Sequence, residues 1–314
     1  MELFPSNSNF NFMRARVVSL SLAFIIMVVA FGAMGVNGFN YALDFTGGTV
    51  AELRFQTPVE AEPVRQRLET AGFENAVVQT FGAGSDLVVR LKPREGDGDA
   101  ARSGQAIAAA ASAPGNPARL LRSESVGPQV GKELAINGLY AAIFVVLGFL
   151  AYVWIRFELK FAIAALITTL HDVVLVAGWF ALSGHEFDLT VLAGILSVMG
   201  YSINDTIVVF DRVRENFRTL HKLTPIEVLN RSINQTLSRT IITSFVAFLT
   251  IVALYLYGGN SLKGMAESQM IGIVVGTLSS ILVACPLLLS FGVTKQDLLP
   301  KARDALDAEL ARRP

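Results

Sequence analysis

Six long apolar segments constrain this chain more than any other feature of its sequence. Each has roughly the length of about 20 residues that a helix needs to cross the ~30 Å hydrocarbon core of a bilayer. They run over residues 17–36, 134–155, 161–182, 189–210, 240–257 and 270–291. With 52% hydrophobic and only 17% charged residues, the chain is too apolar for an ordinary soluble domain. The sequence therefore predicts an α-helical integral membrane protein with six transmembrane helices.

The first apolar segment has features of both a signal peptide and a membrane anchor. Arg14 and Arg16 precede it, and small residues such as Ala30 and Gly35 close it. The apolar core of a signal peptide has only about 7–15 residues, which is shorter than this run. We therefore expect residues 1–36 to contain an uncleaved anchor, and cleavage is the alternative.

The charges of the connecting segments predict the orientation in the membrane. If six helices alternate, the basic residues that follow one another on one side are Arg14, Arg16, Arg156, Lys160, Arg212, Arg214, Arg218, Lys222, Arg231, Lys295, Lys301 and Arg303. The short connections on the other side contain only Lys263. By the positive-inside rule, both termini, the loop 211–239 and the tail 292–314 are expected in the cytoplasm. The balance of 26 basic and 26 acidic residues gives no reason to expect a nucleic acid partner.

Residues 37–133 form the one extramembrane segment that is long enough to fold by itself. Alternating apolar residues predict strands, and helical spacing predicts helices. The strands are expected at 49–55, 76–81, 87–91 and 118–127, and the helices at 58–72 and 106–112. This β-α-β-β-α-β order predicts a small α+β domain with a ferredoxin-like split motif. We expect it to bind a partner or to act as a lever.

Ionisable side chains are costly inside a membrane, and the six segments contain three of them, His171, Asp172 and Asp205. A charged aspartate at a helix centre costs about 2.5–3.5 kcal/mol on insertion scales, so each needs a partner, a water-filled cavity or a proton. Helical spacing puts small or polar residues, including Gly194 and Ser202, on the face of Asp205. Asp205 is therefore predicted to point into the helix bundle.

Arg239 is the predicted partner of Asp205, because it lies about one turn into the membrane interface at a similar expected depth. A pair that exchanges a proton and a purely structural ion pair both fit this pattern. For His171 and Asp172, ordinary hydrogen bonding between helices is an equal alternative to a role in proton movement. Adjacent residues of a helix point about 100° apart, which argues against a joint site.

Small residues recur on the sixth segment at the spacing of closely packed membrane helices. Gly272, Gly276, Ser279 and Ser280 lie on one stripe, which is a small-xxx-small pattern. Gly194 belongs to a similar narrow face on the fourth segment. We expect these faces to pack against each other, with gating as the alternative.

No motif predicts a metal site, a cofactor or a catalytic group. His171 and Asp172 are not followed by a His or Glu that could complete a metal site. The single Cys285 has no partner for an intrachain disulfide. Zinc-protease, serine-nucleophile and kinase spacings do not occur. The sequence therefore predicts a protein that is not an enzyme.

Six stretches follow one another in order from the first segment to the sixth. They are YALDFTGGT (41–49), VGPQVGKEL (126–134), HDVVLVAG (171–178), GYSINDTIVVFDRVREN (200–216), QTLSRTIITS (235–244) and IGIVVGTLSS (271–280). These stretches resemble the signatures of the SecF branch of the SecD/SecF family, in the resistance-nodulation-division superfamily. The resemblance implies a bacterial inner-membrane subunit of the Sec protein-export machinery, with the 37–133 domain in the periplasm.

The resemblance also implies roles for individual residues. In this family the aspartate of the GYSxND stretch carries protons, and the matching residue is Asp205. The arginine of the RTxITS stretch, here Arg239, is important for proton passage. The DFTGG stretch implies a junction between the first helix and the periplasmic domain. The matching positions are Asp44, Gly47 and Gly48, together with Gly131 at the entry to the second helix.

The implied function is completion of preprotein translocation, driven by the proton-motive force after SecA and the SecYEG channel have acted. A separate SecD chain is the expected partner, because this chain ends after one six-helix half. SecA, YajC and YidC are further candidates, besides the preprotein and membrane lipid. An exporter of small molecules or lipids from the same superfamily and a passive translocase scaffold are the alternatives.

Overall fold

The computed structural model describes residues 9–81, 84–92, 100–220, 222–294 and 297. These residues divide into two compact units, which are treated separately below. The helical unit comprises residues up to 40, residues 142–185 and residues from 190 onward. The α+β unit comprises residues 41–141 and 186–189.

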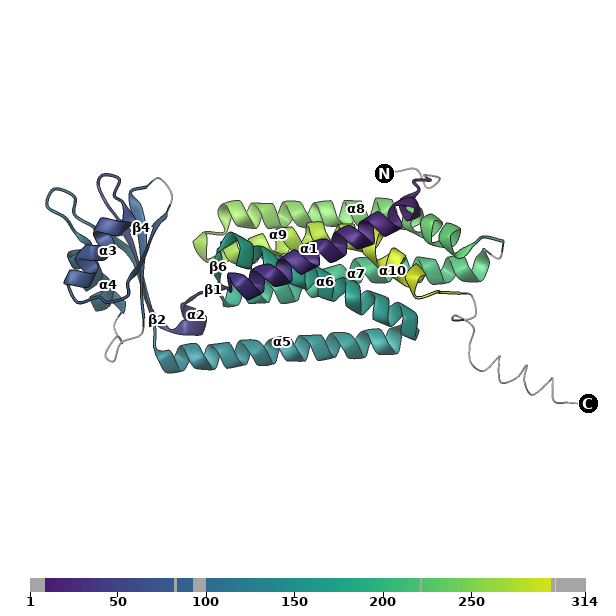
Figure 1. Ribbon diagram of the computed structural model, residues 1–314, viewed down its shortest axis with the longest axis horizontal. Helices are drawn as coiled ribbons and strands as arrows, with labels where there is room; N and C mark the ends of the chain where they lie inside the picture. The colour runs from purple at the N-terminus through teal and green to yellow at the C-terminus, as the bar shows by residue number, and fades with distance from the viewer. Residues whose placement is uncertain (1–8, 82–83, 93–99, 221, 295–296, 298–314) are drawn as a thin grey trace, which may run out of the picture. The chain divides into compact units, whose positions relative to one another are not determined.

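Six helices of the described residues are long and apolar enough to cross a membrane (Figure 1). This confirms the predicted number of spanning helices. They are α1 (Arg16–Val36) after a short 3-10 turn η1 (Phe12–Ala15), α5 (Pro128–Arg156), α6 (Leu159–Ser183), α7 (Leu189–Thr219), α8 (Pro225–Tyr257), and a sixth helix that begins as α9 (Asn260–Ser279).

The sixth helix is not regular throughout, although its apolar pattern predicts one segment over 270–291. After α9 it continues as a π-helical turn, η2 (Ser280–Ala284), and ends as α10 (Cys285–Ser290). Pro286 lies in the first turn of α10. Its ring has no N–H and clashes with the carbonyl group four residues earlier, so regular α-helical bonding cannot continue through this position. The wider π-helical turn accommodates the interruption.

Both ends of the predicted 211–239 loop are continuations of membrane-length helices. α7 extends to Thr219, and α8 begins at Pro225. The Thr224 hydroxyl accepts a hydrogen bond from the Glu227 amide, and the Glu227 carboxylate accepts one from the Thr224 amide. This capping box, with proline in the first turn, explains why α8 starts here and not near residue 240.

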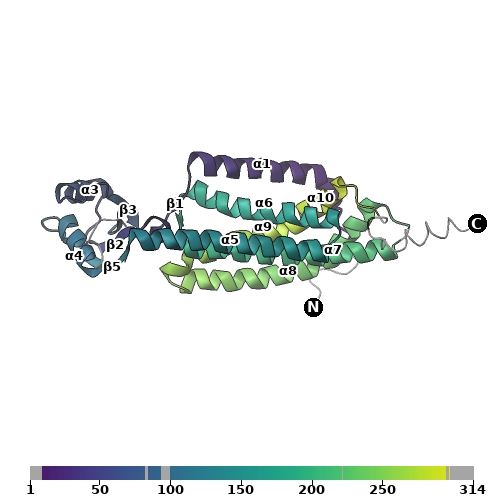
Figure 2. The ribbon, with the colours of Figure 1, turned by 90° about the horizontal axis from the view of Figure 1, so that it is seen from below.

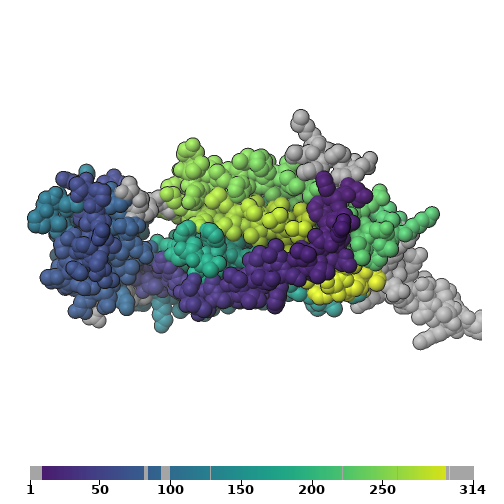
Figure 3. Space-filling view, turned by 45° about the horizontal axis from the view of Figure 1, so that its top comes forward, coloured from purple at the N-terminus to yellow at the C-terminus, as the bar shows by residue number. Residues whose placement is uncertain are grey.

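Within the helical unit, α9 packs between α6 and α8, and α1 lies along α6 (Figures 2 and 3). An apolar core occupies the end of the unit where α6 begins and α7 ends. Phe161 and Phe210 meet edge to face there, with ring centroids 5.4 Å apart. Met13 of η1 is completely buried in the same core. The hydroxyl and carboxyl groups described below lie on α6, α7, α8 and α9.

The α+β unit contains a four-stranded antiparallel sheet with strand order β3-β4-β2-β5. Along the chain its elements are β2 (Gly48–Arg54), α3 (Ala61–Thr70), β3 (Val77–Phe81), β4 (Asp86–Leu91), α4 (Ala100–Ala111) and β5 (Arg119–Val126). Apolar residues of β2 and β4 alternate toward α3 and α4, and Leu53, Leu68 and Ile107 are completely buried between sheet and helices. The short strands β1 (Asn40–Tyr41) and β6 (Glu186–Phe187) pair with each other in a separate two-stranded sheet.

Candidate functional site

Asp172 lies on α6, is completely buried, and is held by side chains of three helices. Its Oδ2 atom accepts hydrogen bonds from Ser202 of α7 at 2.5 Å and from Ser279 of α9 at 2.7 Å. Its Oδ1 atom lies 2.9 Å from Nδ1 of His171. Hydrogen bonds to a charged acceptor are roughly twice as strong as those between neutral groups. They compensate for the water that a carboxylate loses on burial. The site therefore satisfies a carboxylate in the dry interior.

The contact between His171 and Asp172 differs from the expectation that the two neighbours point apart. Their Cα–Cβ bonds do diverge along the helix, but both side chains are long enough to turn back toward each other, and both are buried. The other ring nitrogen of His171, Nε2, has no hydrogen-bond partner among the described residues. The structure thus brings these two predicted residues together in one site.

The glycine stripe lies where α9 meets α7. A Cβ atom added to Gly272 would lie 2.1 Å from a methyl carbon of Val198, and one added to Gly276 would lie 3.3 Å from the Cβ atom of Ser202. A Cβ atom on Gly194 of α7 would lie 2.0 Å from a serine hydroxyl of α9. These glycines let the two helices approach closely enough for serine hydroxyls to reach Asp172.

Asp205 lies almost one turn after Ser202 on α7 and is only 3% exposed, as the sequence predicts. Within the described part of the chain, it accepts one hydrogen bond, from Ser244 of α8 at a long 3.4 Å. The Ser244 hydroxyl in turn accepts a 2.7 Å hydrogen bond from Thr277 of α9. Asp205 is therefore as enclosed as Asp172 but has much weaker hydrogen-bonding compensation.

Arg239 does not contact Asp205, and this corrects the predicted pair. It is exposed on α8, and no ion pair joins it to Asp205 in the described structure. Ser244, the residue that reaches Asp205, lies five positions later, which is about 140° around the helix and about 7.5 Å along it. The positive charge of Arg239 therefore acts on Asp205 only through space.

Sequence reasoning missed Ser244 and Thr277. It assigned the inward face of α8 from Arg239, whereas Thr243 on that face hydrogen-bonds back to the Arg239 carbonyl oxygen. The signal for Ser244 was its place in the QTLSRTIITS stretch. Ser280, a predicted packing residue, donates to the Thr277 carbonyl oxygen and contacts neither carboxylate.

A cavity of about 220 Å³ lies among α7, α8 and α9 on the side of Asp205 that faces the start of α7. Its lining combines apolar residues with polar ones, the latter being Ser197, Tyr201, Thr250 and Gln269. Tyr201 is one helical turn before Asp205. The cavity therefore adds polar surface next to the weakly compensated carboxylate.

The DFTGG stretch lies in the α+β unit, where α2 (Leu43–Thr46) leads into β2. Asp44 accepts a 3.0 Å hydrogen bond from the amide of Leu189, the first residue of α7. Gly47 and Gly48 adopt φ values of +66° and +120°, which favour glycine. A Cβ atom on Gly131 of α5 would lie 2.8 Å from the Gly47 nitrogen. The stretch thus touches the starts of both α5 and α7.

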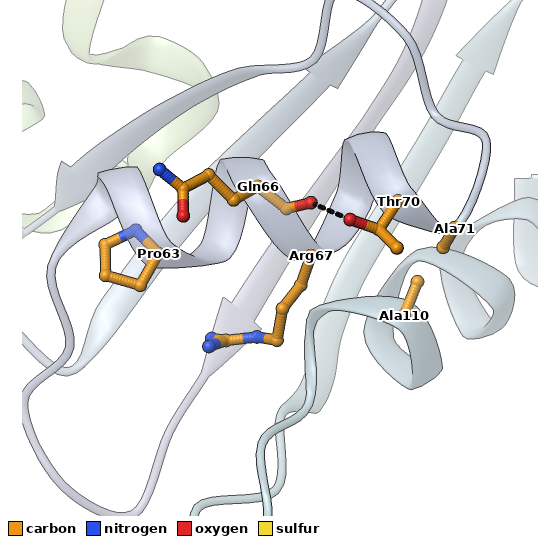
Figure 4. A pocket seen from close by; sticks show the side chains of 6 residues that line it. All are labelled: Pro63, Gln66, Arg67, Thr70, Ala71 and Ala110. Atoms are coloured by element: carbon orange, nitrogen blue, oxygen red, sulfur yellow. Dashed lines mark hydrogen bonds between the residues drawn. The ribbon is translucent and has the colours of Figure 1, made fainter.

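The surface of the α+β unit has one hollow of about 540 Å³ between α3 and α4 (Figure 4). Arg67 lies beside it and donates from Nε to the Ala111 carbonyl oxygen, at the C-terminal end of α4. A cation at this end of a helix is favourable, which gives Arg67 a structural role. The lining residues include no acidic side chain.

The described residues contain no group of three or more His, Cys, Asp or Glu side chains that could hold a metal ion. The helical unit instead combines six helices of membrane length with two buried carboxylates that hydroxyl groups connect to the sixth helix. These features define a class: a multi-pass membrane protein with an α+β unit inserted after its first helix and carboxyl groups inside its bundle.

Comparison with known proteins identifies the family. The family model described as "Protein export membrane protein SecD/SecF, C-terminal" matches residues 107–294, and the "SecD/SecF GG Motif" matches residues 32–59. The protein translocase subunit SecF of Pseudomonas aeruginosa is 45% identical over 95% of this chain and 96% of its own length. The same subunit of Escherichia coli O157:H7 is 41% identical over 92% of this chain and 90% of its own length. The chain belongs to the SecD/SecF family.

Solved structures agree with this assignment. The crystal structure of SecDF, a translocon-associated membrane protein from Thermus thermophilus, has a TM-score of 0.82 and 38% identity over 92% of this chain. SecDF in its super-membrane-facing form has a TM-score of 0.67 and 37% identity over 98% of this chain. The chain spans only 40% and 41%, respectively, of those longer SecDF chains.

Proposed function

We propose that this chain acts in protein export across the bacterial inner membrane, with SecD, as a subunit that uses proton movement to complete preprotein translocation. The names of its relatives and its likeness to part of SecDF support the role in export and the partnership with SecD. The distribution of basic residues supports cytoplasmic termini and a periplasmic α+β domain. The order of strands and helices in that unit supports a ferredoxin-like fold. SecYEG and SecA follow as partners from the same role, and YajC and YidC as further candidates.

The environment of Asp205 carries the proposal for proton movement. A buried carboxylate with one 3.4 Å hydrogen bond pays a large cost for its charge, which binding a proton removes. A positive charge close to a carboxylate favours its charged form, so a change in the separation of Arg239 and Asp205 changes proton binding. The polar cavity near Tyr201 provides one side from which a proton can approach. Asp172 and His171 form the second part of the proposed pathway.

The energy and its transmission fit this scheme. A potential of about 100 mV supplies about 2.3 kcal/mol per charge, which biases two conformations about fifty-fold. α7 carries Asp205, and its first amide is bonded to Asp44 in the DFTGG stretch. Movement of the first residue of α7 is therefore passed to Asp44. This links the proton site to the domain that is proposed to act on the preprotein.

The test is gradient-dependent completion of preprotein translocation in vesicles that contain this chain, SecD, SecYEG and SecA. Asp205→Asn is expected to lose the gradient-dependent component and to keep the component that ATP alone supports. Asn204→Ala is the matched control, because Asn204 is the exposed polar neighbour of Asp205. Unchanged gradient dependence in an assembled Asp205→Asn complex would rule out the proton role and favour a scaffold.

The same assay tests how Arg239 acts. Because Arg239 makes no contact with Asp205, its charge matters more than its shape. Arg239→Lys is expected to keep most of the gradient-dependent component, and Arg239→Gln to lose it. Equal loss in both variants would show that a specific guanidinium contact is needed.

A further inference from the structure

The hydroxyl group of Ser279 has two acceptors within reach. It lies 2.7 Å from Oδ2 of Asp172 and 3.1 Å from the carbonyl oxygen of Gly276 in its own helix. Ser202 of α7 points to the same Oδ2 atom at 2.5 Å. Two helices are therefore attached to α6 through one carboxyl oxygen, and one of the attachments has an alternative acceptor.

The strength of these attachments depends on the charge of Asp172. Hydrogen bonds to a carboxylate are roughly twice as strong as those to a neutral oxygen. When Asp172 takes up a proton, on either oxygen, the advantage of Oδ2 over the Gly276 carbonyl is lost. The Ser279 hydroxyl then turns to Gly276, and the link between α6 and α9 weakens.

We propose that Asp172 is a second proton-binding site, and that its protonation releases Ser279 and so loosens α9 from α6. This inference rests on the proposed proton-driven function and deepens it. Ser202 and Ser279 are positioning residues, because they act through the carboxyl group of Asp172. His171 is placed to deliver the proton: Nδ1–H of its imidazolium form gives a proton to Oδ1 and leaves neutral imidazole.

The charged surroundings of Asp172 are sparse, which leaves His171 and the acid itself to set the response. On α7 the nearest ionisable groups are Tyr201, directly before Ser202, and Asp205, almost one turn after it. α1 has no ionisable residue after Arg16, and α9, η2 and α10 have none after Glu267 except Cys285. Arg239 on α8 is exposed. Within the described bundle, no lysine or arginine side chain therefore stabilises the charged form of Asp172.

The sixth helix is irregular directly after Ser279. The π-helical turn Ser280–Ala284 begins one residue after Ser279, and Pro286 prevents regular bonding across it. Such turns are sites where a helix bends or shifts with little loss of bonding. Thr277, two residues before Ser279, is joined to Asp205 through Ser244. α9 is therefore hydrogen-bonded to Asp172 directly and to Asp205 through Ser244, immediately before its π-helical turn.

The test is infrared difference spectroscopy of the full chain in lipid vesicles, titrated from about pH 4 to about pH 9, which covers the range of carboxyl groups in proteins. We expect a carbonyl band of a buried carboxylic acid that disappears in Asp172→Asn, beside a band that disappears in Asp205→Asn. Ser279→Ala is expected to keep the Asp172 band but to raise the pH at which it appears, because the Ser279 hydroxyl stabilises only the charged form. Ser268→Ala, which removes another buried hydroxyl of α9, is expected to leave it unchanged.

Absence of any band that Asp172→Asn removes would overturn the proposal, because Asp172 would then keep one protonation state throughout. An Asp172 band that appears over the same pH range with and without the Ser279 hydroxyl would also overturn it. If Asp172→Asn does not accumulate in membranes, comparison of the pH range of this band in Ser279→Ala and in Ser268→Ala decides alone. The Asp205 band is read separately in the same spectra, so failure of the proposed function at Asp205 is distinguished from failure at Asp172.

Discussion

Asp172 and Asp205 are both buried in the same helix bundle, yet their surroundings are opposite. Asp172 has two short hydrogen bonds from serines and a histidine at 2.9 Å. Asp205 has one hydrogen bond of 3.4 Å and no ion pair among the described residues. Burial alone therefore does not assign a role to a membrane carboxylate. The number and length of its hydrogen bonds set how strongly its charged form is stabilised against proton uptake.

Both carboxyl groups are nevertheless hydrogen-bonded, directly or through one other hydroxyl group, to side chains of α9. Ser279 binds Asp172 directly, and Thr277 reaches Asp205 through Ser244. Since these α9 residues are two positions apart, they point to opposite sides of the helix, toward α6 and toward α8. The comparison thus places a strongly bonded acid and a weakly bonded one on either side of a shared element. The predictions below separate the two.

The largest stability effect is expected at the strongly bonded acid. Ser202→Ala combined with Ser279→Ala removes two hydrogen bonds to the Asp172 carboxylate, each worth about 1.5–3 kcal/mol. The free energy of unfolding in lipid micelles at neutral pH should fall by about 3 kcal/mol or more. Because a protonated acid needs these donors less, the loss should shrink as the pH is lowered. A loss that is independent of pH would argue against a charged Asp172 at neutral pH.

The next effect removes the close approach on which both sites depend. Gly272→Ala puts a Cβ atom 2.1 Å from a Val198 methyl carbon, and such overpacking typically costs about 1–3 kcal/mol. Gly200→Ala is the matched control on α7, because nothing lies within 4 Å of its added Cβ atom. Thermal unfolding should show a lower midpoint for Gly272→Ala only. Equal midpoints for the two variants would mean that α7 and α9 are not in close contact.

A smaller effect is expected at the weakly bonded acid. Ser244→Ala removes the long hydrogen bond to Asp205 and the acceptor of Thr277. Thr277 also donates to the Ile273 carbonyl oxygen, so its hydroxyl keeps a partner. The loss in unfolding free energy should stay within about 0.5–1.5 kcal/mol. A cost equal to that of Ser202→Ala would remove the contrast between the two sites.

The smallest effect is expected at a partly exposed carboxylate of the α+β unit. In the α+β unit, hydrogen bonds of 2.8 Å from Arg54 lower the pKa of Asp86 below its ordinary value. A lowered pKa gives stability that is present above the unfolded value of about 3.9 and is lost as pH falls through the folded value. Asp86→Asn should therefore speed hydrogen exchange of β2 and β4 amides slightly at neutral pH and not in strong acid. An effect that grows on acidification would have the wrong sign.

Much of the helical unit could be predicted because hydropathy is a local property. The six helices and the burial of Asp205 follow from apolar length and from the cost of a charge in lipid. The early start of α8 was also readable, since Thr224, Pro225 and Glu227 form a capping signal in the sequence. Apolar length alone places the start of that membrane span near residue 240.

The partners of the carboxyl groups could not be predicted in this way. Arg239 was chosen for its charge and depth, but the side chain that reaches Asp205 is Ser244. A shift of one residue turns a helical side chain by about 100° and moves it by about 1.5 Å. Small errors in the expected depth therefore select a different residue.

By itself, the sequence determined that this chain forms six apolar helices with acids inside them, because each residue carries its own hydropathy and charge. Only the tertiary structure decided that Asp172 is strongly bonded and Asp205 weakly bonded. That difference depends on the rotation and offset of α6, α7, α8 and α9 against one another, which glycine contacts and the π-helical turn set. Hydrogen bonds require atoms within about 3 Å, and only packed helices define distances that short.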